Sequence, residues 1–303
     1  MPIDKLKRVV FPKDWNLKGY LKDRKDAIDR ALEKLPQLPT RTTNAASAAR
    51  KALATNGKRF RPLMVLATAD LFERGSDPAI MAAALSVECI HTASLILDDL
   101  PCMDDASLRR GEPTLHTMVG EADTILAAMG LVAEAHHLLL NPAFRADKRQ
   151  MAMSRMLTQA YSLDGLCGGQ SDDLADLGSH TLSDLEFIHA KKTGSLFIAA
   201  VELACTWCRG RSHETQKLVA YARNLGLAFQ IKDDLLDVAP SGTTGKDANQ
   251  DADKSNFVTV LGEEACSQLY DDLMQTALDQ LTGFGQSARH MRELTHAIWQ
   301  RQS

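Results

Sequence analysis

Two groups of aspartates stand out because each one ends a run of apolar residues. The first is residues 98–105 (DDLPCMDD), and the second is residues 233–237 (DDLLD). Carboxylates on a solvated helix face normally have polar neighbours, whereas these follow residues of the buried type. Because burying unpaired carboxylates is costly, we expect cations to compensate them.

The spacing of these aspartates favours magnesium. Asp233 and Asp237 are four residues apart and share one helix face. Asp98 and Asp104 are six apart, but Pro101 between them predicts a bend that lets Asp104 turn back. Mg²⁺ takes carboxylate and water oxygens and completes its shell with substrate phosphates. One such cluster could equally be an acidic helix end, but two of them favour a metal site. A calcium-binding EF-hand loop fits the spacing poorly.

Basic residues accompany both acidic groups. Arginine binds phosphate oxygens with a two-pronged fork, and lysine adds a mobile point charge. The formal net charge is −4, so the overall field favours neither nucleic acid nor an anionic membrane, and an anionic substrate needs a local basic cluster. Such clusters occur at residues 57–62 (GKRFRP), 109–111 (RRG), 191–194 (KKTG) and 245–247 (GKD), with Lys254 nearby. This interleaving of acids and cations predicts a site for diphosphates.

Helical periodicity predicts the elements that position these groups. Ala- and Leu-rich segments recur, with few β-branched runs and few hairpin turns. Asp77 before Pro78 predicts one helix start, and Ser183 with Glu186 predicts a capping box at another. We expect a single helical domain over residues 1–303, with helices near residues 17–35, 43–54, 59–74, 78–99, 121–139, 148–164, 182–206, 214–237, 261–281 and 285–301.

Several other classes of protein fit the sequence less well. The six cysteines form no disulfide framework, and Cys205-x-x-Cys208 is more typical of a helix interior than of a metal or redox site. The first residues are charged throughout and resemble no signal peptide, so we expect a cytoplasmic location. The most apolar stretch, residues 124–140, contains Glu134 and two histidines, which favours a buried helix over a membrane span.

At this point the sequence resembles the trans-isoprenyl diphosphate synthases over nearly its whole length. It is most similar to the bacterial geranylgeranyl diphosphate synthases of carotenoid pathways. The resemblance implies an all-α, single-domain antiparallel helix bundle with a central active-site cavity, and a homodimer. The motifs that carry it are GKRFRP (57–62), ECIHTASLILDDLPCMDDASLRRGEPTLH (88–116), GGQSDD (168–173), KKTGSLF (191–197), GLAFQIKDDLLD (226–237) and GKDANQDADKS (245–255).

The resemblance also implies roles for individual residues. Two Mg²⁺ ions on the allylic diphosphate would be held by Asp98 and Asp104, supported by Asp99. A third ion would be held by Asp233, helped by Asp237. The allylic diphosphate would be bound by Arg109, Lys192 and Lys246, with Lys254 nearby. Isopentenyl diphosphate would be bound by Lys58, Arg61, His91 and Arg110. The carbocation would be stabilised by Thr193 and Gln230. A lone histidine in a helix is more often a packed core residue, but His91 lies seven residues before Asp98, two turns up one helix face, which favours the ligand role.

The length of the product should depend on the floor of the pocket. Ser94 and Ala93 lie four and five residues before Asp98, about one helical turn deeper, roughly 6–7.5 Å along the axis. Both are small, whereas related farnesyl-producing enzymes commonly carry an aromatic residue at the position of Ala93. The expected product is therefore the twenty-carbon geranylgeranyl diphosphate, made from isopentenyl diphosphate and dimethylallyl, geranyl or farnesyl diphosphate.

Other functions stay open at the level of sequence. A farnesyl diphosphate synthase is one alternative. A non-catalytic regulatory subunit of a prenyl synthase is another, although such subunits tend to lose one acidic motif and both motifs are intact here. Terpene cyclases usually replace the second aspartate group with an Asn/Ser/Glu triad. A helical scaffold with acidic patches is the fourth alternative.

Overall fold

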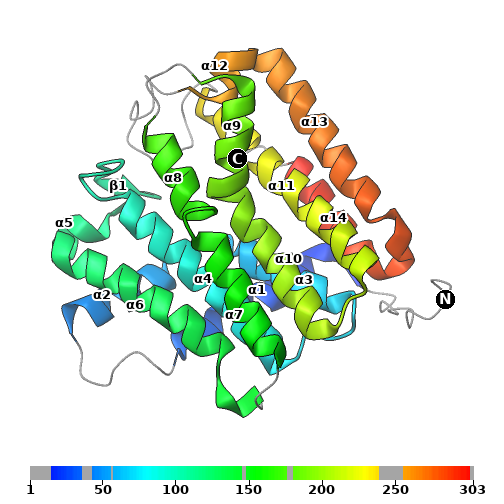
Figure 1. Ribbon diagram of the computed structural model, residues 1–303, viewed down its shortest axis with the longest axis horizontal. Helices are drawn as coiled ribbons and strands as arrows, with labels where there is room; N and C mark the ends of the chain where they lie inside the picture. Colours follow the sequence, from blue (N-terminus) through cyan, green and yellow to red (C-terminus); the bar gives the residue numbers. More distant parts are fainter. Residues whose placement is uncertain are drawn as a thin grey trace.

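The computed structural model describes residues 15–35, 43–55, 57–144, 148–175, 180–238 and 255–300. These residues are overwhelmingly helical, which confirms the predicted all-α class (Figure 1). The helices are α1 (Leu17–Glu33), α2 (Asn44–Ala54), α3 (Phe60–Asp70), α4 (Pro78–Asp98), α5 (Leu115–Val119), α6 (Glu121–Leu139), α7 (Lys148–Tyr161), α8 (Leu166–Leu174), α9 (Leu182–His189), α10 (Ser195–Cys208), α11 (Ser212–Val238), α12 (Phe257–Leu261), α13 (Glu263–Gln280) and α14 (Arg289–Trp299). Three shorter elements join them: the 3-10 segments η2 (Pro142–Phe144) and η4 (Thr282–Ala288), and the π-helical turn η3 (Ala190–Gly194).

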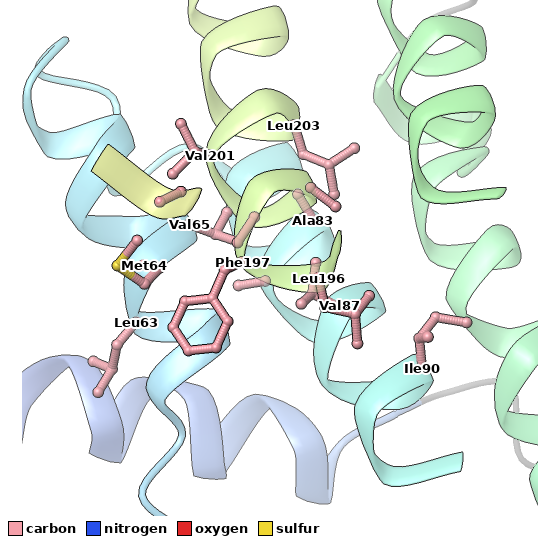
Figure 2. Packing of buried hydrophobic residues seen from close by; sticks show 14 of the residues in the cluster. Leu63, Met64, Val65, Ala83, Val87, Ile90, Leu196, Phe197, Val201 and Leu203 are labelled. Carbon is pink, nitrogen blue, oxygen red and sulfur yellow. The ribbon is translucent and has the colours of Figure 1, made fainter. Parts of the chain in front are cut away.

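Helix α4 forms the centre of the bundle and carries the first aspartates at its C-terminus. Asp77 caps its N-terminus by accepting a hydrogen bond from Ala79, and Pro78 is its first residue, as the sequence predicts. Its apolar face packs against α3, α6 and α10. Figure 2 shows Val87 of α4 beside Leu196 of α10, with Val65 of α3 close by. An anchored core helix of this kind fixes the place of its terminal carboxylates.

The predicted helix over residues 182–206 is not continuous. It begins as α9, passes through the π-helical turn η3 and continues as α10. The capping box also lies two residues earlier than predicted: Thr181 accepts from the backbone of Asp184, whose carboxylate accepts from the backbone of Thr181. The prediction of Ser183 with Glu186 was wrong because the helix begins at Leu182.

Helix α11 carries the second aspartate group at its C-terminal end. It packs against α10, η3 and α13 (Figure 1). Two short strands, β1 (Leu108–Arg109) and β2 (Glu112–Pro113), pair antiparallel in a hairpin that follows the first aspartate group. The predicted helices leave this segment outside any helix, and α5, α8 and α12 were not predicted.

Two helical segments within the described residues are long and apolar enough to cross a membrane by length and composition alone. One is α4, in which 72% of the most apolar window is buried inside the bundle. The other is Glu121–Phe144, where 44% of that window is buried. The burial of α4 identifies it as a core helix, since core helices of soluble proteins pass the same criterion.

Candidate active site

The first aspartate group folds back on itself after α4 ends. The backbone N–H of Asp104 donates to the carbonyl of Asp98 at 2.9 Å, and the N–H of Asp105 donates to the carbonyl of Leu100 at 3.1 Å. The predicted turn around Pro101 is therefore present. Burial raises the pKa of Asp98 to about 6, and the nearby Asp104 adds to this although Lys192 opposes it. A cation bound here would relieve that cost.

The hairpin after this turn fixes Arg109 against the first aspartate group. Its Nε and Nη2 lie 2.7 and 2.6 Å from Oδ1 of Asp99, whose side chain is almost completely buried. Strand pairing of Arg109 with Glu112 and a hydrogen bond from Thr114 to the carbonyl of Ala106 hold the hairpin in place. Asp99 therefore orients Arg109, while its supporting role toward a metal stays a prediction.

The second aspartate group is organised around Asp234, to which the sequence assigned no role. Its carboxylate accepts hydrogen bonds from Nε2 of Gln230 and from the backbone N–H of Phe257, both at 2.9 Å. Gln230 in turn accepts from the hydroxyl of Thr193 at 3.2 Å. Burial raises the pKa of Asp234 to about 6. The structure thus brings the two predicted carbocation-stabilising residues together and shows what orients the amide.

Asp233 and Asp237 both lie near the C-terminal end of α11. Asp233 is partly buried and Asp237 is exposed. Asp233 acts electrostatically on Arg61, which lies on a different element, the start of α3. Asp233 is therefore near enough to the predicted site for isopentenyl diphosphate for its charge to raise the pKa of Arg61.

The π-helical turn η3 lies between the two acidic groups. Its Lys192 donates to Asp173 of α8 at 2.6 Å, and Lys191 approaches Asp172 at 3.5 Å. Helix α8 can come so close because residue 169 is glycine: a Cβ there would lie 2.3 Å from the backbone nitrogen of Lys192. The positive charge of Lys192 also lowers the pKa of Asp98. Short π-helical turns are frequently found at functional sites.

Arg61 and His91 form the centre of the second predicted substrate site. Nη1 of Arg61 lies 3.2 Å from Nε2 of His91, and its guanidinium stacks over the ring of Phe197 at 4.9 Å. Burial lowers the pKa of Arg61 to about 10, although Glu88 and Asp233 oppose the shift. Burial and the neighbouring guanidinium groups of Arg61, Arg110, Arg109 and Arg59 lower the pKa of His91, so His91 is neutral at pH 7. Nε of Arg61 has no hydrogen-bond partner among the described residues, which leaves this donor available to an anion.

The remaining predicted residues occupy different environments. Lys58 and Arg110 are exposed, and Arg110 has a positive φ of 56°. Ala93 is buried, and the hydroxyl of Ser94 donates to the carbonyl of His91 at 2.9 Å. Lys246 and Lys254 lie outside the described residues. Two surface cavities of about 300 and 330 Å³ are lined by residues of α10–α11 and of the α1–α2 region, away from both aspartate groups.

Gln170 of α8 was not assigned a role from the sequence, although it belongs to the family motif at residues 168–173 (GGQSDD). Its side chain is buried, and neither its amide oxygen nor its amide nitrogen has a hydrogen-bond partner within the described part of the chain. A buried primary amide without partners is costly, so a bound ligand or water would be expected to satisfy it.

The donor set fits Mg²⁺ rather than a metal held wholly by protein. In the ranges that the structure describes, no three His, Cys, Asp or Glu side chains converge as a preformed metal site. Mg²⁺ is usually bound by one or two carboxylates, with waters and substrate phosphates completing the shell. Asp98 and Asp104, brought together by the turn, match this requirement.

Comparisons with known proteins agree with this geometry. Residues 43–295 match the model of the polyprenyl synthetase family. The chain is 36% identical to geranylgeranyl pyrophosphate synthase 10 (mitochondrial) of Arabidopsis thaliana, over 89% of this chain and 81% of that protein. It is 38% identical to synthase 11 (chloroplastic) of the same plant, over 89% and 78%.

Solved structures give the same result. An FPP/GFPP synthase from Zymomonas mobilis superposes with a TM-score of 0.83 at 34% identity, covering 94% of this chain and 99% of that one. A geranyltransferase from Helicobacter pylori, complexed with magnesium and isoprenyl diphosphate, superposes with a TM-score of 0.83 at 26% identity, covering 96% and 100%. The chain therefore belongs to the polyprenyl synthetase family, as the motifs around its two aspartate groups indicate.

Proposed function

We propose that this protein is a trans-prenyltransferase that condenses isopentenyl diphosphate with allylic diphosphates to give geranylgeranyl diphosphate. The observation that carries the proposal is that each aspartate group has a cationic group of its own nearby. Lys192 acts on Asp98, and Arg61 acts on Asp233 while lying beside His91. This arrangement suits two diphosphates bound next to each other, each facing its own cations.

Magnesium would be held by Asp98 and Asp104 on one side and by Asp233 on the other, with Asp99 and Asp237 in support. When bound, it supplies positive charge that stabilises the departing diphosphate. The number of ions proposed is about three with substrate bound, because the diphosphate oxygens complete each shell.

The protein's own residues then have distinct tasks. Arg109 and Lys192 bind the allylic diphosphate and stabilise the charge that develops on it as the allylic carbon–oxygen bond breaks. The hydroxyl of Thr193 and the amide oxygen of Gln230 direct partial negative charge toward the allylic cation. The cation adds to the double bond of isopentenyl diphosphate, held nearby by Arg61 and His91. Loss of a proton to the released diphosphate completes the reaction.

The proposed twenty-carbon product rests on the small residue at position 93. Ala93 lies on the buried face of α4, which packs against α6. A methyl group there leaves more room for a growing chain than an aromatic ring would. The use of the product in carotenoid biosynthesis is proposed from the resemblance of the segment around Asp98.

A homodimer is also proposed, supported by an apolar surface on α6. Leu126 and Met129 of α6 are 56% and 64% exposed, Leu140 directly after α6 is 48% exposed, and Met151 of α7 is 71% exposed. Large exposed apolar groups gathered on one face commonly mark protein interfaces. Light scattering of the purified protein should give twice the mass of the 33.2 kDa chain, and a Met129→Glu variant should give less dimer.

A cytoplasmic location is the corresponding proposal for the cell. The described cysteines are free thiols, and Cys102 and Cys167 are exposed, which suits a reducing compartment. Fractionation of cells producing the full chain would test this.

The central experiment is incubation of the protein with Mg²⁺, isopentenyl diphosphate and farnesyl diphosphate, followed by chromatography of the products. A single twenty-carbon diphosphate is expected. Farnesyl diphosphate as the end product from geranyl diphosphate would favour a farnesyl diphosphate synthase, and hydrocarbons formed without isopentenyl diphosphate would favour a cyclase. No turnover by the wild-type protein, with an active synthase as positive control, would favour a regulatory subunit and contradict the proposal.

A further inference from the structure

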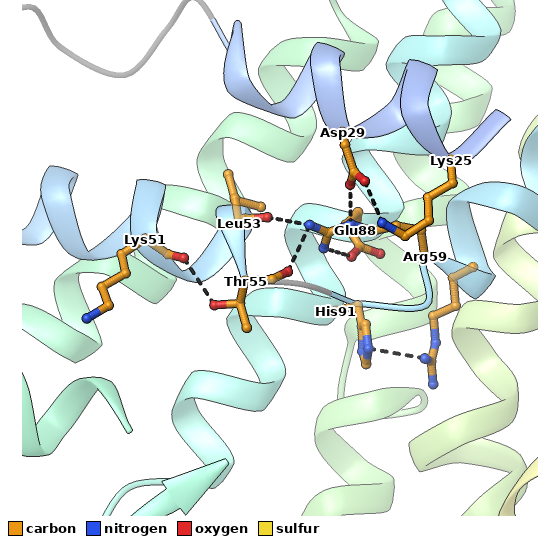
Figure 3. Close-up of polar contacts among 9 residues, drawn as sticks. Lys25, Asp29, Lys51, Leu53, Thr55, Arg59, Glu88 and His91 are labelled. Atoms are coloured by element: carbon orange, nitrogen blue, oxygen red, sulfur yellow. Dashed lines mark hydrogen bonds and ion pairs between the residues drawn. The ribbon is translucent and has the colours of Figure 1, made fainter. Parts of the chain in front are cut away.

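Arg59 has the least exposed surface of the three cations in its motif. It stands between Lys58 and Phe60 immediately before α3, and only 6% of it is exposed. Figure 3 shows its guanidinium group among Asp29, Glu88, Leu53 and Thr55. It lies 2.8 Å from Asp29 and 2.6 Å from Glu88, and it donates to the carbonyls of Leu53 at 2.7 Å and Thr55 at 3.0 Å. One side chain thereby connects α1, the end of α2 and α4.

The backbone of Arg59 is also unusual. It is left-handed, with φ 49° and ψ 35°, a backbone conformation that residues other than glycine rarely adopt. Such a conformation persists when its surroundings fix it, and here the hydrogen bonds of the side chain do so. The left-handed residue lets the chain direct Arg59 inward while Lys58 remains exposed and Arg61 reaches His91.

We propose that Arg59 is a positioning residue for isopentenyl diphosphate, held by Glu88 and Asp29 so that Lys58 and Arg61 are presented to that substrate. This inference rests on the proposed prenyltransferase function and adds a residue that contacts the protein instead of the substrate. The loop preceding α3 carries Lys58, and Arg61 lies in the first turn of α3, so the geometry of this segment should decide how well both proposed ligands bind the diphosphate.

The electrostatics of the same group explain how several guanidinium groups can lie close together. A Cβ on Gly57 would lie 3.1 Å from Arg110 and 3.3 Å from Arg59, which shows how near these side chains are. Burial alone would lower the pKa of Arg59, but its bond to Asp29 and the charge of Glu88 raise it, so it stays charged. The negative charge of Glu88 also acts to raise the pKa of Arg61 and that of Arg110. It is therefore a shared buried counter-charge for the cations of this site.

A purely structural role for Arg59 is the alternative, and the chain offers a matched control for it. Arg24 of α1 binds Asp70 at the far end of α3 and the carbonyl of Gly75. The Arg24–Asp70 pair also links α1 to α3, but at the end of α3 opposite Arg61. Loss of Arg24 should weaken the packing of α1 without moving the loop before α3.

The test compares steady-state kinetics of Arg59→Gln, Arg59→Lys and Arg24→Gln with those of the wild-type protein. For Arg59→Gln, KM for isopentenyl diphosphate should rise about tenfold or more, because misaligned charge-assisted hydrogen bonds lose strength, while KM for farnesyl diphosphate changes about twofold at most. Arg59→Lys should recover part of the loss, since lysine keeps the charge and not the four hydrogen bonds. Arg24→Gln should lower Tm and leave both KM values unchanged.

Equal changes of both KM values in Arg59→Gln, or a lower Tm with unchanged kinetics, would overturn the proposal. If Arg59→Gln does not fold, Arg59→Lys and Asp29→Asn decide it, because Asp29→Asn keeps an acceptor oxygen for Arg59, and the other partner of Asp29 is Lys25, which is no proposed substrate ligand. A selective rise in KM for isopentenyl diphosphate in those variants supports the proposal, and its absence rejects it.

A readout independent of turnover separates this inference from the proposed function. Amide hydrogen exchange in the segment 57–63 should become faster in Arg59→Gln than in Arg24→Gln. A wild-type protein that forms no prenyl product would overturn the proposed function. Unchanged exchange in Arg59→Gln would overturn the positioning role even if the wild-type protein is active.

Discussion

Replacing Ala93 by phenylalanine should shorten the product from twenty to fifteen carbons. Ala93 is 2% exposed and lies five residues before Asp98, about 7.5 Å deeper along α4. A chain extending from a diphosphate at Asp98 past this level would meet the new ring. Overpacking a filled interior costs about 1–3 kcal/mol. If that cost falls on the transition state for the last condensation, extension of farnesyl diphosphate should slow about 5- to 150-fold.

The assay follows radiolabelled isopentenyl diphosphate into products of each chain length, starting from geranyl diphosphate. Ala82→Phe is the matched control: Ala82 lies eleven residues before Ala93, on nearly the same face of α4 and about 16.5 Å further from Asp98. It should lower Tm without changing product length. Ala93→Leu provides a milder variant if the aromatic one does not fold. An unchanged ratio of fifteen- to twenty-carbon products in a folded Ala93 variant would refute the argument.

Three further predictions concern other parts of the bundle. Thr193→Val removes the hydroxyl that donates to Gln230 and should lower the single-turnover rate by about tenfold without changing KM, whereas an unchanged rate would contradict its role. Burial raises the pKa of Glu134, so ionising this carboxyl costs more free energy in the folded state than in the unfolded state. Glu134→Gln should therefore raise Tm at pH 8, and the gain should disappear at pH 4, which is below the ordinary pKa of 4.5. An equal Tm difference between variant and wild type at both pH values would count against this prediction. Gly169→Ala should lower kcat, measured with both substrates saturating, because the new methyl group displaces η3 and with it Lys192. An unchanged kcat would show that the position of η3 is not important for the reaction.

The long helices could be predicted from the sequence because burial imposes a helical period on apolar residues. Helix α6 agrees with its predicted bounds, and α4 ends one residue earlier than predicted. The turn of Asp104 toward Asp98 could also be predicted, because proline restricts the backbone in a known way. Which cations lie near each aspartate group could be predicted only from the family resemblance, since spacing within a helix gives no distance between helices.

Other features had no clear signal in the sequence. A π-helical turn differs from an α-helix by one residue and has no characteristic composition, so residues 182–206 were predicted as one helix. Helix α8 contains Gly168 and Gly169, which lower helix propensity, and it was not predicted. The inward orientation of Arg59 depends on acceptors from three separate segments, which only the folded chain brings together.

The π-helical turn η3 constrains how this part of the chain can be redesigned. The one extra residue in this turn between α9 and α10 rotates the direction of every later side chain by about 100° around the helix axis. Deleting one residue between positions 190 and 194 would restore a straight helix and rotate α9 relative to α10 by that angle. Thr181 and Phe197 could then no longer keep their present neighbours together. Grafts and chimaeras of related chains should therefore exchange residues 181–208 as one unit, with junctions outside it.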